Sequence, residues 1–206
     1  MNDASRQAHW EDVYTTKGET EVSWFQESPA PSLELIAATG LSEDAAIIDI
    51  GGGASRLIDD LLARKFRRVT VLDLSGAALL AAKERLGGAG PDVQWVVADV
   101  TKWEPNETYD LWHDRAAFHF LTEAGDRVAY LSRLKIALKP GGYCMIATFA
   151  PDGPERCSGL PVVRYNAESL SLTLGDEFGL LKTQRHSHTT PWGSEQRFQF
   201  SLFQRA

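Results

Sequence analysis

Apolar residues follow two different spacings along this chain. Short apolar runs, typical of buried strands, alternate with stretches whose apolar residues lie three or four positions apart, as in helices that face a core. The pattern predicts strands at 46–50, 69–74, 93–99, 109–114 and 143–150, and helices at 31–40, 55–65, 76–86 and 125–138. Alternation of this kind predicts a parallel sheet with helices on both of its faces.

The last part of the chain has a different pattern. Two strands are predicted at 179–190 and 195–206, joined by the short turn PWGS. A turn this short joins only antiparallel strands. The predicted fold class is therefore α/β, with a doubly wound, seven-stranded and mostly parallel sheet whose last strand is antiparallel. Because no linker interrupts the pattern, we expect residues 1–206 to form a single domain.

Residues 1–40 are predicted to form an N-terminal helical segment that caps this domain. Residues 1–8 are polar, and we expect them to be frayed. Trp10 and Tyr14 share one face of a predicted helix, and Trp24 follows in the next loop. These aromatic side chains either pack on the sheet or cover a ligand as a lid, where their ring faces attract a cation.

Composition and charge narrow the class of protein. The chain has 206 residues, of which 43% are hydrophobic and 24% charged, and its formal net charge is −7. An acidic chain without a basic patch is not expected to bind nucleic acid or an anionic membrane. Two isolated cysteines, no secretory signal and no long apolar run predict a cytoplasmic protein. No set of side chains has the spacing of a metal site.

A run of glycines indicates where a ligand binds. In IIDIGGGASRL, residues 47–57, Gly51 to Gly53 follow a buried strand and precede a helix. Ligands of open α/β sheets bind at this edge, where bare backbone allows close approach. Asp73 ends the next strand about 20 residues further on, where a carboxylate accepts the ribose hydroxyls of an adenosine.

The same stretch indicates which adenosine compound is bound. A dinucleotide fingerprint requires a third glycine, and Arg56 occupies that position. Asp49, just before the glycines, would repel a pyrophosphate but suits a cationic ligand. No phosphate-binding Walker sequence is present. S-adenosylmethionine, which carries sulfonium and ammonium groups and no phosphate, is therefore the predicted cofactor.

Several motifs together resemble a known family over nearly the whole chain. They are IIDIGGGASRL, VTVLDLS, VVADV, YDLWHDRAAFHFL and LKPGGYCMIATF. The sequence looks like a class I S-adenosylmethionine-dependent methyltransferase, a fold with a seven-stranded sheet. The glycine motif and the aromatic N-terminal segment are similar to a branch of lysine methyltransferases. The segment from His113 onwards and HTTPWG look more like thiopurine and thiol methyltransferases.

The resemblance implies a set of cofactor-binding residues. Gly51 and Gly53 would approach the methionine part, and Asp49 would orient its ammonium group. Asp73 would take the ribose hydroxyls. Three further residues would surround the adenine, with Leu74 against the ring, Asp99 at its amino group and Val100 beside it. His113 would lie near the reactive methyl group, and Trp10, Tyr14 and Trp24 are added to this set as candidate lid residues.

Candidate catalytic residues follow the fourth predicted strand. His113, Asp114 and Arg115 lie at the ligand edge of the sheet. A histidine or carboxylate there can take the proton that a nucleophile sheds, and an arginine can hold an anionic substrate. The alternative is an Asp114–Arg115 ion pair that only fixes the loop.

The leading functional hypothesis is methyl transfer to a small-molecule nucleophile, with a thiol as one acceptor. A protein lysine methyltransferase is the alternative, although Asp114-Arg115-Ala116 departs from the Asp-Lys-Gly of that branch. A cofactor-binding module without catalysis and a nicotinamide dehydrogenase are two further alternatives. The sequence leaves the acceptor and the oligomeric state open.

Overall fold

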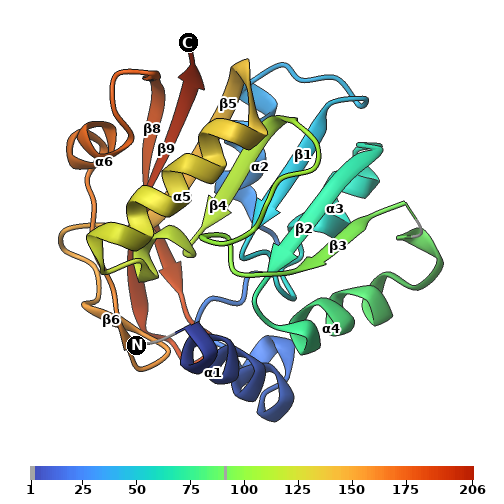
Figure 1. Ribbon diagram of the computed structural model, residues 1–206. Helices are drawn as coiled ribbons and strands as arrows, with labels where there is room; N and C mark the ends of the chain where they lie inside the picture. The colour runs from blue at the N-terminus through green and yellow to red at the C-terminus, as the bar shows by residue number, and fades with distance from the viewer. Residues whose placement is uncertain (1–2, 91) are drawn as a thin grey trace.

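The computed structural model describes residues 3–90 and 92–206, and these residues form a seven-stranded central sheet. Its strands are β1 (Ala46–Ile50), β2 (Arg68–Asp73), β3 (Gln94–Val97), β4 (Tyr109–Arg115), β5 (Leu138–Phe149), β8 (Phe178–Thr189) and β9 (Glu195–Arg205). Their order across the sheet is β3-β2-β1-β4-β5-β9-β8 (Figure 1). All neighbours pair in parallel except β9, which is antiparallel to both β5 and β8. The predicted fold class is confirmed.

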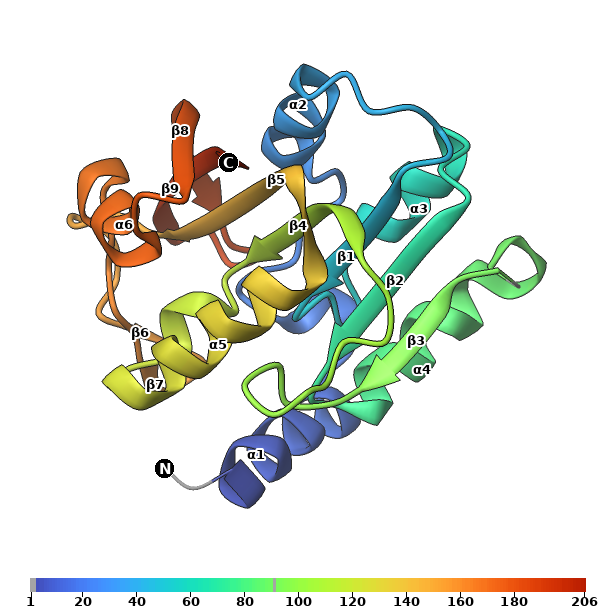
Figure 2. The ribbon, with the colours of Figure 1, turned by 45° about the horizontal axis from the view of Figure 1, so that its top comes forward.

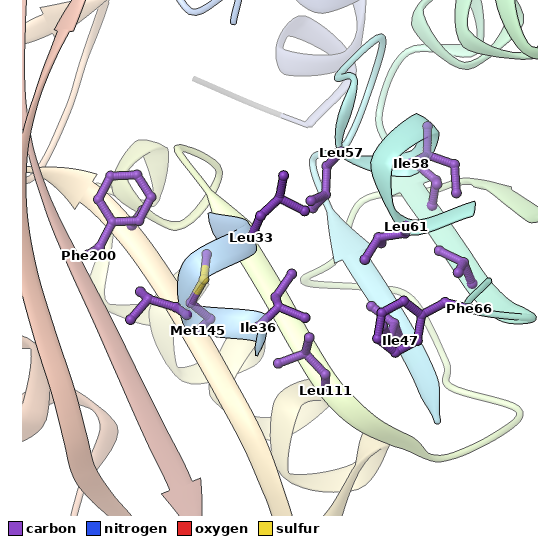
Figure 3. Close-up of a cluster of buried hydrophobic side chains, with 14 of the residues drawn as sticks. Leu33, Ile36, Ile47, Leu57, Ile58, Leu61, Phe66, Leu111, Met145 and Phe200 are labelled. Carbon is purple, nitrogen blue, oxygen red and sulfur yellow. The ribbon is translucent and has the colours of Figure 1, made fainter. Parts of the chain in front are cut away.

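Helices cover both faces of this sheet. The described helices are α1 (Asp3–Thr16), α2 (Ala30–Ala38), α3 (Leu57–Ala63), α4 (Gly76–Leu86), α5 (Ala124–Ala137) and α6 (Ala167–Leu174). Leu33 of α2 and Leu61 of α3 belong to one buried cluster with strand residues such as Leu111 (Figure 3). Tyr130 of α5 and Leu170 of α6 belong to a second cluster on the opposite face. Each such buried leucine contributes about 1.5–3 kcal/mol, so these two clusters hold the strand ends in place.

Helix α1 lies across the end of the sheet rather than on either face. It runs beside α4, below the carboxyl ends of β1 and β2 in the view of Figure 1, and Figure 2 shows the same placement from another side. Residues 3–8 belong to this helix, so the expectation of a frayed start is wrong for them. Residues 1–2 lie outside the described part of the chain.

Other boundaries differ from the prediction by a few residues. Strand β5 starts at Leu138 rather than at position 143, and helix α6 was not predicted. Asn166 caps α6, because its side chain accepts from the backbone N–H of Ser169 at 2.7 Å. The loop after β5 contains a short hairpin of β6 (Arg156–Cys157) and β7 (Leu160–Pro161). Within the described residues, no helix is both long and apolar enough to cross a membrane.

Candidate functional site

The glycine turn follows β1 and takes backbone angles that other residues avoid. Gly51 and Gly53 have φ angles of +66° and +49°. The N–H of Gly51 donates to the Leu72 carbonyl on β2 at 2.7 Å, which fixes the turn against the neighbouring strand. A Cβ atom at Gly52 would lie 2.6 Å from the Asp49 carboxylate. The turn therefore requires glycine for its shape and leaves its backbone bare toward the ligand edge.

Asp49 is held in place by a hydrogen-bonded series of buried side chains. Nδ1 of His113 lies 2.6 Å from Asp49 Oδ1, and Nε2 lies 2.9 Å from the Ser32 hydroxyl at the start of α2. All three residues are at most 3% exposed. These hydrogen bonds fix one carboxylate oxygen of Asp49, Oδ1, and the other oxygen, Oδ2, lies beside Gly52.

Asp73 ends β2 next to the same turn. Its Oδ1 accepts from the backbone N–H of Ser75 at 2.8 Å, and its Oδ2 lies close to Gly53. Burial raises the pKa of Asp73 to about 7, and the nearby Asp49 charge adds to this. A carboxyl group with such a pKa favours a partner that donates hydrogen bonds to it.

Asp99 follows β3 and connects the site to α1. Its Oδ1 accepts from the backbone and hydroxyl of Thr101, and its Oδ2 accepts from Arg6 Nη2 at 3.1 Å. Arg6 also donates to Asp126 at 2.9 Å. One turn further along α1, Glu11 accepts from the Ser75 hydroxyl and from the Ala77 N–H at the start of α4. Polar contacts thus hold α1 over the strand ends at Arg6 and at Glu11.

Aromatic rings from three segments meet under α1. The Trp10 ring centroid lies 5.6 Å from that of Trp24 and 5.0 Å from that of Phe120. Trp24 also donates through Nε1 to the Tyr14 hydroxyl at 3.1 Å. Burial raises the pKa of Tyr14 well above its ordinary value, so this hydroxyl stays neutral. The rings form an aromatic cover over the glycine turn.

These groups surround one pocket of about 820 Å³, open solvent included. The predicted residues that line it are Trp10, Tyr14, Trp24, Gly51, Asp73, Leu74, Asp99, Val100 and Arg115. A second pocket, which shares Arg115 with the first, is lined by Asp49 and His113 together with Gly51 and Gly52. Gly53 lies beside both Asp73 and the Tyr14 hydroxyl. The structure thus gathers the predicted cofactor residues around two adjoining pockets.

The three candidate catalytic residues do not share one surface. They form the end of β4, which continues to Arg115 instead of stopping at Asp114. Successive side chains of a strand point to opposite faces. His113 and Arg115 therefore reach the pockets, whereas Asp114 points to the face covered by α5.

Asp114 holds the loop that follows β4. Its carboxylate accepts from the Tyr130 hydroxyl at 2.7 Å, from the Ala117 N–H at 2.9 Å and from the Phe118 N–H at 3.1 Å. Burial raises the pKa of Asp114 to about 6. The anticipated ion pair with Arg115 is not formed among the described residues, because the Arg115 guanidinium donates to the Trp24 carbonyl at 3.0 Å. Asp114 positions a pocket wall, since Ala117 lines the pocket.

Several residues that line the first pocket were not among the predicted site residues, and Arg6 and Phe120 are two of them. Arg6 was missed because its segment was expected to be frayed, and Phe120 because it lies beyond the three candidate catalytic residues. Cys157, on β6, lines the same pocket. Burial raises the pKa of the Cys157 thiol to about 11, so it lines the wall as a neutral group.

The residues present fit S-adenosylmethionine. Carboxylates at the ends of three neighbouring strands, Asp49, Asp73 and Asp99, suit an ammonium group, two hydroxyls and an amino group. The backbone at Gly51 and Gly53 is bare, and an added Cβ at Gly53 would lie 3.0 Å from the Tyr14 hydroxyl. The aromatic cover suits a sulfonium cation.

Comparisons with known proteins give the same assignment. A family described as Methyltransferase domain matches residues 47–142. A trans-aconitate 2-methyltransferase of Paracidovorax citrulli (strain AAC00-1) is 35% identical over 136 residues, which cover 64% of this chain and 48% of that protein. A malonyl-[acyl-carrier protein] O-methyltransferase of Ilyobacter polytropus is 29% identical over 60% of this chain and 45% of its own length. The chain thus spans about half the length of the curated relatives it matches.

A solved structure matches almost the whole chain. The N-methyltransferase NodS from Bradyrhizobium japonicum, solved with S-adenosyl-L-homocysteine, superposes with a TM-score of 0.72 over 95% of this chain and 97% of its own, at 15% sequence identity. This likeness concerns the fold. With the matched domain and the arrangement of the site, it confirms the resemblance seen in the motifs. Residues 47–142 of this chain match a methyltransferase domain, and the fold is that of the class I S-adenosylmethionine-dependent methyltransferases.

Proposed function

We propose that this chain transfers a methyl group from S-adenosylmethionine to a small-molecule nucleophile. One observation carries the proposal: the pocket that contains Asp73 and Asp99 also contains Arg115 and the wall formed by Ala117 and Phe120. Cofactor-binding groups and a separate, covered surface for an acceptor therefore share one space. The aromatic cover narrows this space, which favours a small acceptor over a protein chain.

The residues of the chain bind, orient and exclude water in this proposal. Asp73 accepts the ribose hydroxyls, Asp49 accepts from the ammonium group, and Asp99 accepts from the adenine amino group. The cofactor supplies a methyl group that is already activated by the sulfonium. The rate gain then comes mainly from alignment, and holding two reactants in line is worth up to about 7–11 kcal/mol.

The charge at Arg115 bears on the choice of acceptor. A cation beside the pocket repels an ammonium group, which weighs against a lysine side chain as the acceptor. It attracts an anionic nucleophile, and both a thiolate and a carboxylate are anionic. A thiol acceptor stays a prediction. The names of the two relatives, which refer to trans-aconitate and to a malonyl group, make an organic acid the other acceptor to test.

Binding and transfer are tested separately. Calorimetry with S-adenosylhomocysteine is expected to show binding to the wild type and weaker binding to Asp73→Ala, by about 1–3 kcal/mol. Mass spectrometry then follows methyl transfer from labelled cofactor to panels of thiols and organic acids, with a protein lysate in parallel. Methylated small molecules are expected. Label found only in protein bands would contradict the proposal, and cofactor binding without any transfer would favour a non-catalytic module.

A further inference from the structure

The guanidinium of Arg115 has one edge without a hydrogen-bond partner. Its Nη1 donates to the Trp24 carbonyl at 3.0 Å, and its Cζ lies 5.1 Å from the centre of the Phe198 ring. Nε and Nη2 are buried, and neither makes a hydrogen bond. These two nitrogens form one side of the planar group, where two parallel N–H bonds match the two oxygens of a carboxylate.

No neighbouring carboxylate bonds to this edge, although the charge of Asp49 is near enough to favour the charged form of Arg115. Tyr14 and Cys157 lie close, but burial raises the pKa of each, so both are neutral. Asp49 is engaged with His113. Among the described residues, no ion pair to Arg115 is formed. Buried charged groups are normally paired, so an unpaired guanidinium edge is unfavourable unless a ligand completes it.

The position of Arg115 is that of a ligand-binding group. It lines both pockets. Arg115 is the last residue of β4, which pairs with β1, so its backbone is anchored by the sheet. A structural arginine would be expected to use its edge on a carboxylate or carbonyl of the chain.

We propose that the Nε–Nη2 edge of Arg115 binds a carboxylate of a ligand, and that the acceptor of this site is an organic acid. The second clause rests on the proposed function. The cofactor has a carboxylate as well, on its methionine part, so the same edge has two possible sources of ligand. Because both nitrogens are shielded from solvent in this structure, binding requires a local movement of the groups around Arg115.

The experiment compares wild type with Arg115→Gln and Arg115→Lys. The lysine variant keeps the charge but loses the two-donor edge. Arg164→Gln is the control, because Arg164 bonds to Gly153 and Glu155 in the loop after β5. Thermal unfolding first establishes that each variant is folded. Calorimetry then measures the affinity of each variant for four compounds. They are S-adenosylhomocysteine, 5′-methylthioadenosine, which has no carboxylate, and the acids malonate and trans-aconitate.

The two sources give different results. If the acceptor supplies the carboxylate, both Arg115 variants bind at least one of the acids about 10- to 100-fold more weakly than wild type, with S-adenosylhomocysteine unchanged. If the cofactor supplies the carboxylate, both variants bind S-adenosylhomocysteine more weakly by a similar factor and bind 5′-methylthioadenosine as well as wild type does. That result overturns the proposal that the acceptor is an organic acid, but it supports carboxylate binding by Arg115. Equal affinities in wild type and both variants for every probe would overturn the whole proposal.

Failure of the proposed function has a different signature. The acids are titrated both with and without S-adenosylhomocysteine. A wild type that binds no S-adenosylhomocysteine contradicts the cofactor assignment, whereas the acid titration of the ligand-free protein still reports on the Arg115 edge.

Discussion

His113 and Asp49 are directly opposite each other on the paired strands β4 and β1, and their side chains are 2.6 Å apart. A carboxylate only accepts hydrogen bonds, so Nδ1 of His113 is the donor. The Ser32 hydroxyl bonds to the other ring nitrogen at 2.9 Å. His113 thus orients Asp49 at the wall of the second pocket, and Ser32 in turn orients His113.

Replacing His113 by alanine is expected to weaken cofactor binding without removing any predicted cofactor contact of Asp49. Asp49 would lose its orienting donor, and S-adenosylhomocysteine should bind about 10- to 100-fold more weakly, since a hydrogen bond to a charged group is worth about 1.5–3 kcal/mol. Ser32→Ala should have a smaller effect. Calorimetry measures both, with His186→Ala on β8 as control. Unchanged affinity in His113→Ala would show that Asp49 needs no support from this side.

Asp73→Asn is expected to stabilise the fold and to weaken binding of the cofactor. A carboxyl group with a pKa of about 7 when folded and about 4 when unfolded binds protons more tightly in the folded state. Its contribution to stability is therefore present below about pH 4 and is lost as the pH rises through about 7. The variant should gain about 2 kcal/mol relative to wild type between pH 5 and pH 8, or about 4–8 °C in Tm.

Thermal unfolding at the two pH values checks this gain, and calorimetry checks the affinity. A difference between variant and wild type that stays constant with pH would contradict the raised pKa of Asp73. Unchanged affinity for S-adenosylhomocysteine would contradict its role at the ribose.

Gly52→Ala tests the shape of the turn. The added methyl group would lie 2.6 Å from both the Asp49 carboxylate and a Val71 methyl, so the turn must move. We expect a loss of about 1–3 kcal/mol in stability and weaker cofactor binding, as in other overpacked sites. Gly88→Ala is the matched control, because a methyl group there would meet nothing within 4 Å. Equal denaturation midpoints for the two variants would show that the turn has room to relax.

Asp114→Ala separates a positioning role from a catalytic one. Three donors would lose their buried acceptor, and unfolding in urea should show a loss of about 2–4 kcal/mol. Tyr130→Phe should lose about 1–2 kcal/mol and slow methyl transfer only slightly. Asp176→Ala, at an exposed position, is the control for stability. If Asp114→Ala unfolds like wild type but no longer transfers methyl groups, the catalytic hypothesis for Asp114 is favoured instead.

The alternation along the chain was sufficient to predict the sheet. Strand β1 and helix α4 have the predicted bounds, because a fully apolar strand and a helix flanked by Ser75 and Gly87 have clear ends. The end of β4 was less clear. One additional strand residue places Asp114 on the opposite face from Arg115, and the sequence around HDRAAF does not mark where the strand stops.

The polar contacts of α1 were beyond sequence reasoning for a different reason. Arg6 lies in a segment without apolar spacing, and its partners Asp99 and Asp126 are about ninety and more residues away along the chain. The apolar contacts of α1, made by Trp10 and Val13, lie in its second half, so apolar spacing gives no signal for the turn that holds Arg6. Its place becomes visible only when the distant carboxylates have been brought together by the fold.

If Asp99 accepts from the adenine amino group as proposed, the cofactor and Arg6 compete for the same carboxylate. The carboxylate that fastens α1 is the same one that is proposed to meet the adenine amino group. Binding of the cofactor would therefore weaken the contact between Arg6 and Asp99, and its release would restore that contact. Dissolved salt screens the Arg6–Asp126 pair more than the Arg6–Asp99 pair, because the Asp126 side chain is 34% exposed and that of Asp99 only 12%. Without cofactor, α1 is held over the site by ion pairs within the chain. With cofactor bound, the cofactor would take over the contact with Asp99.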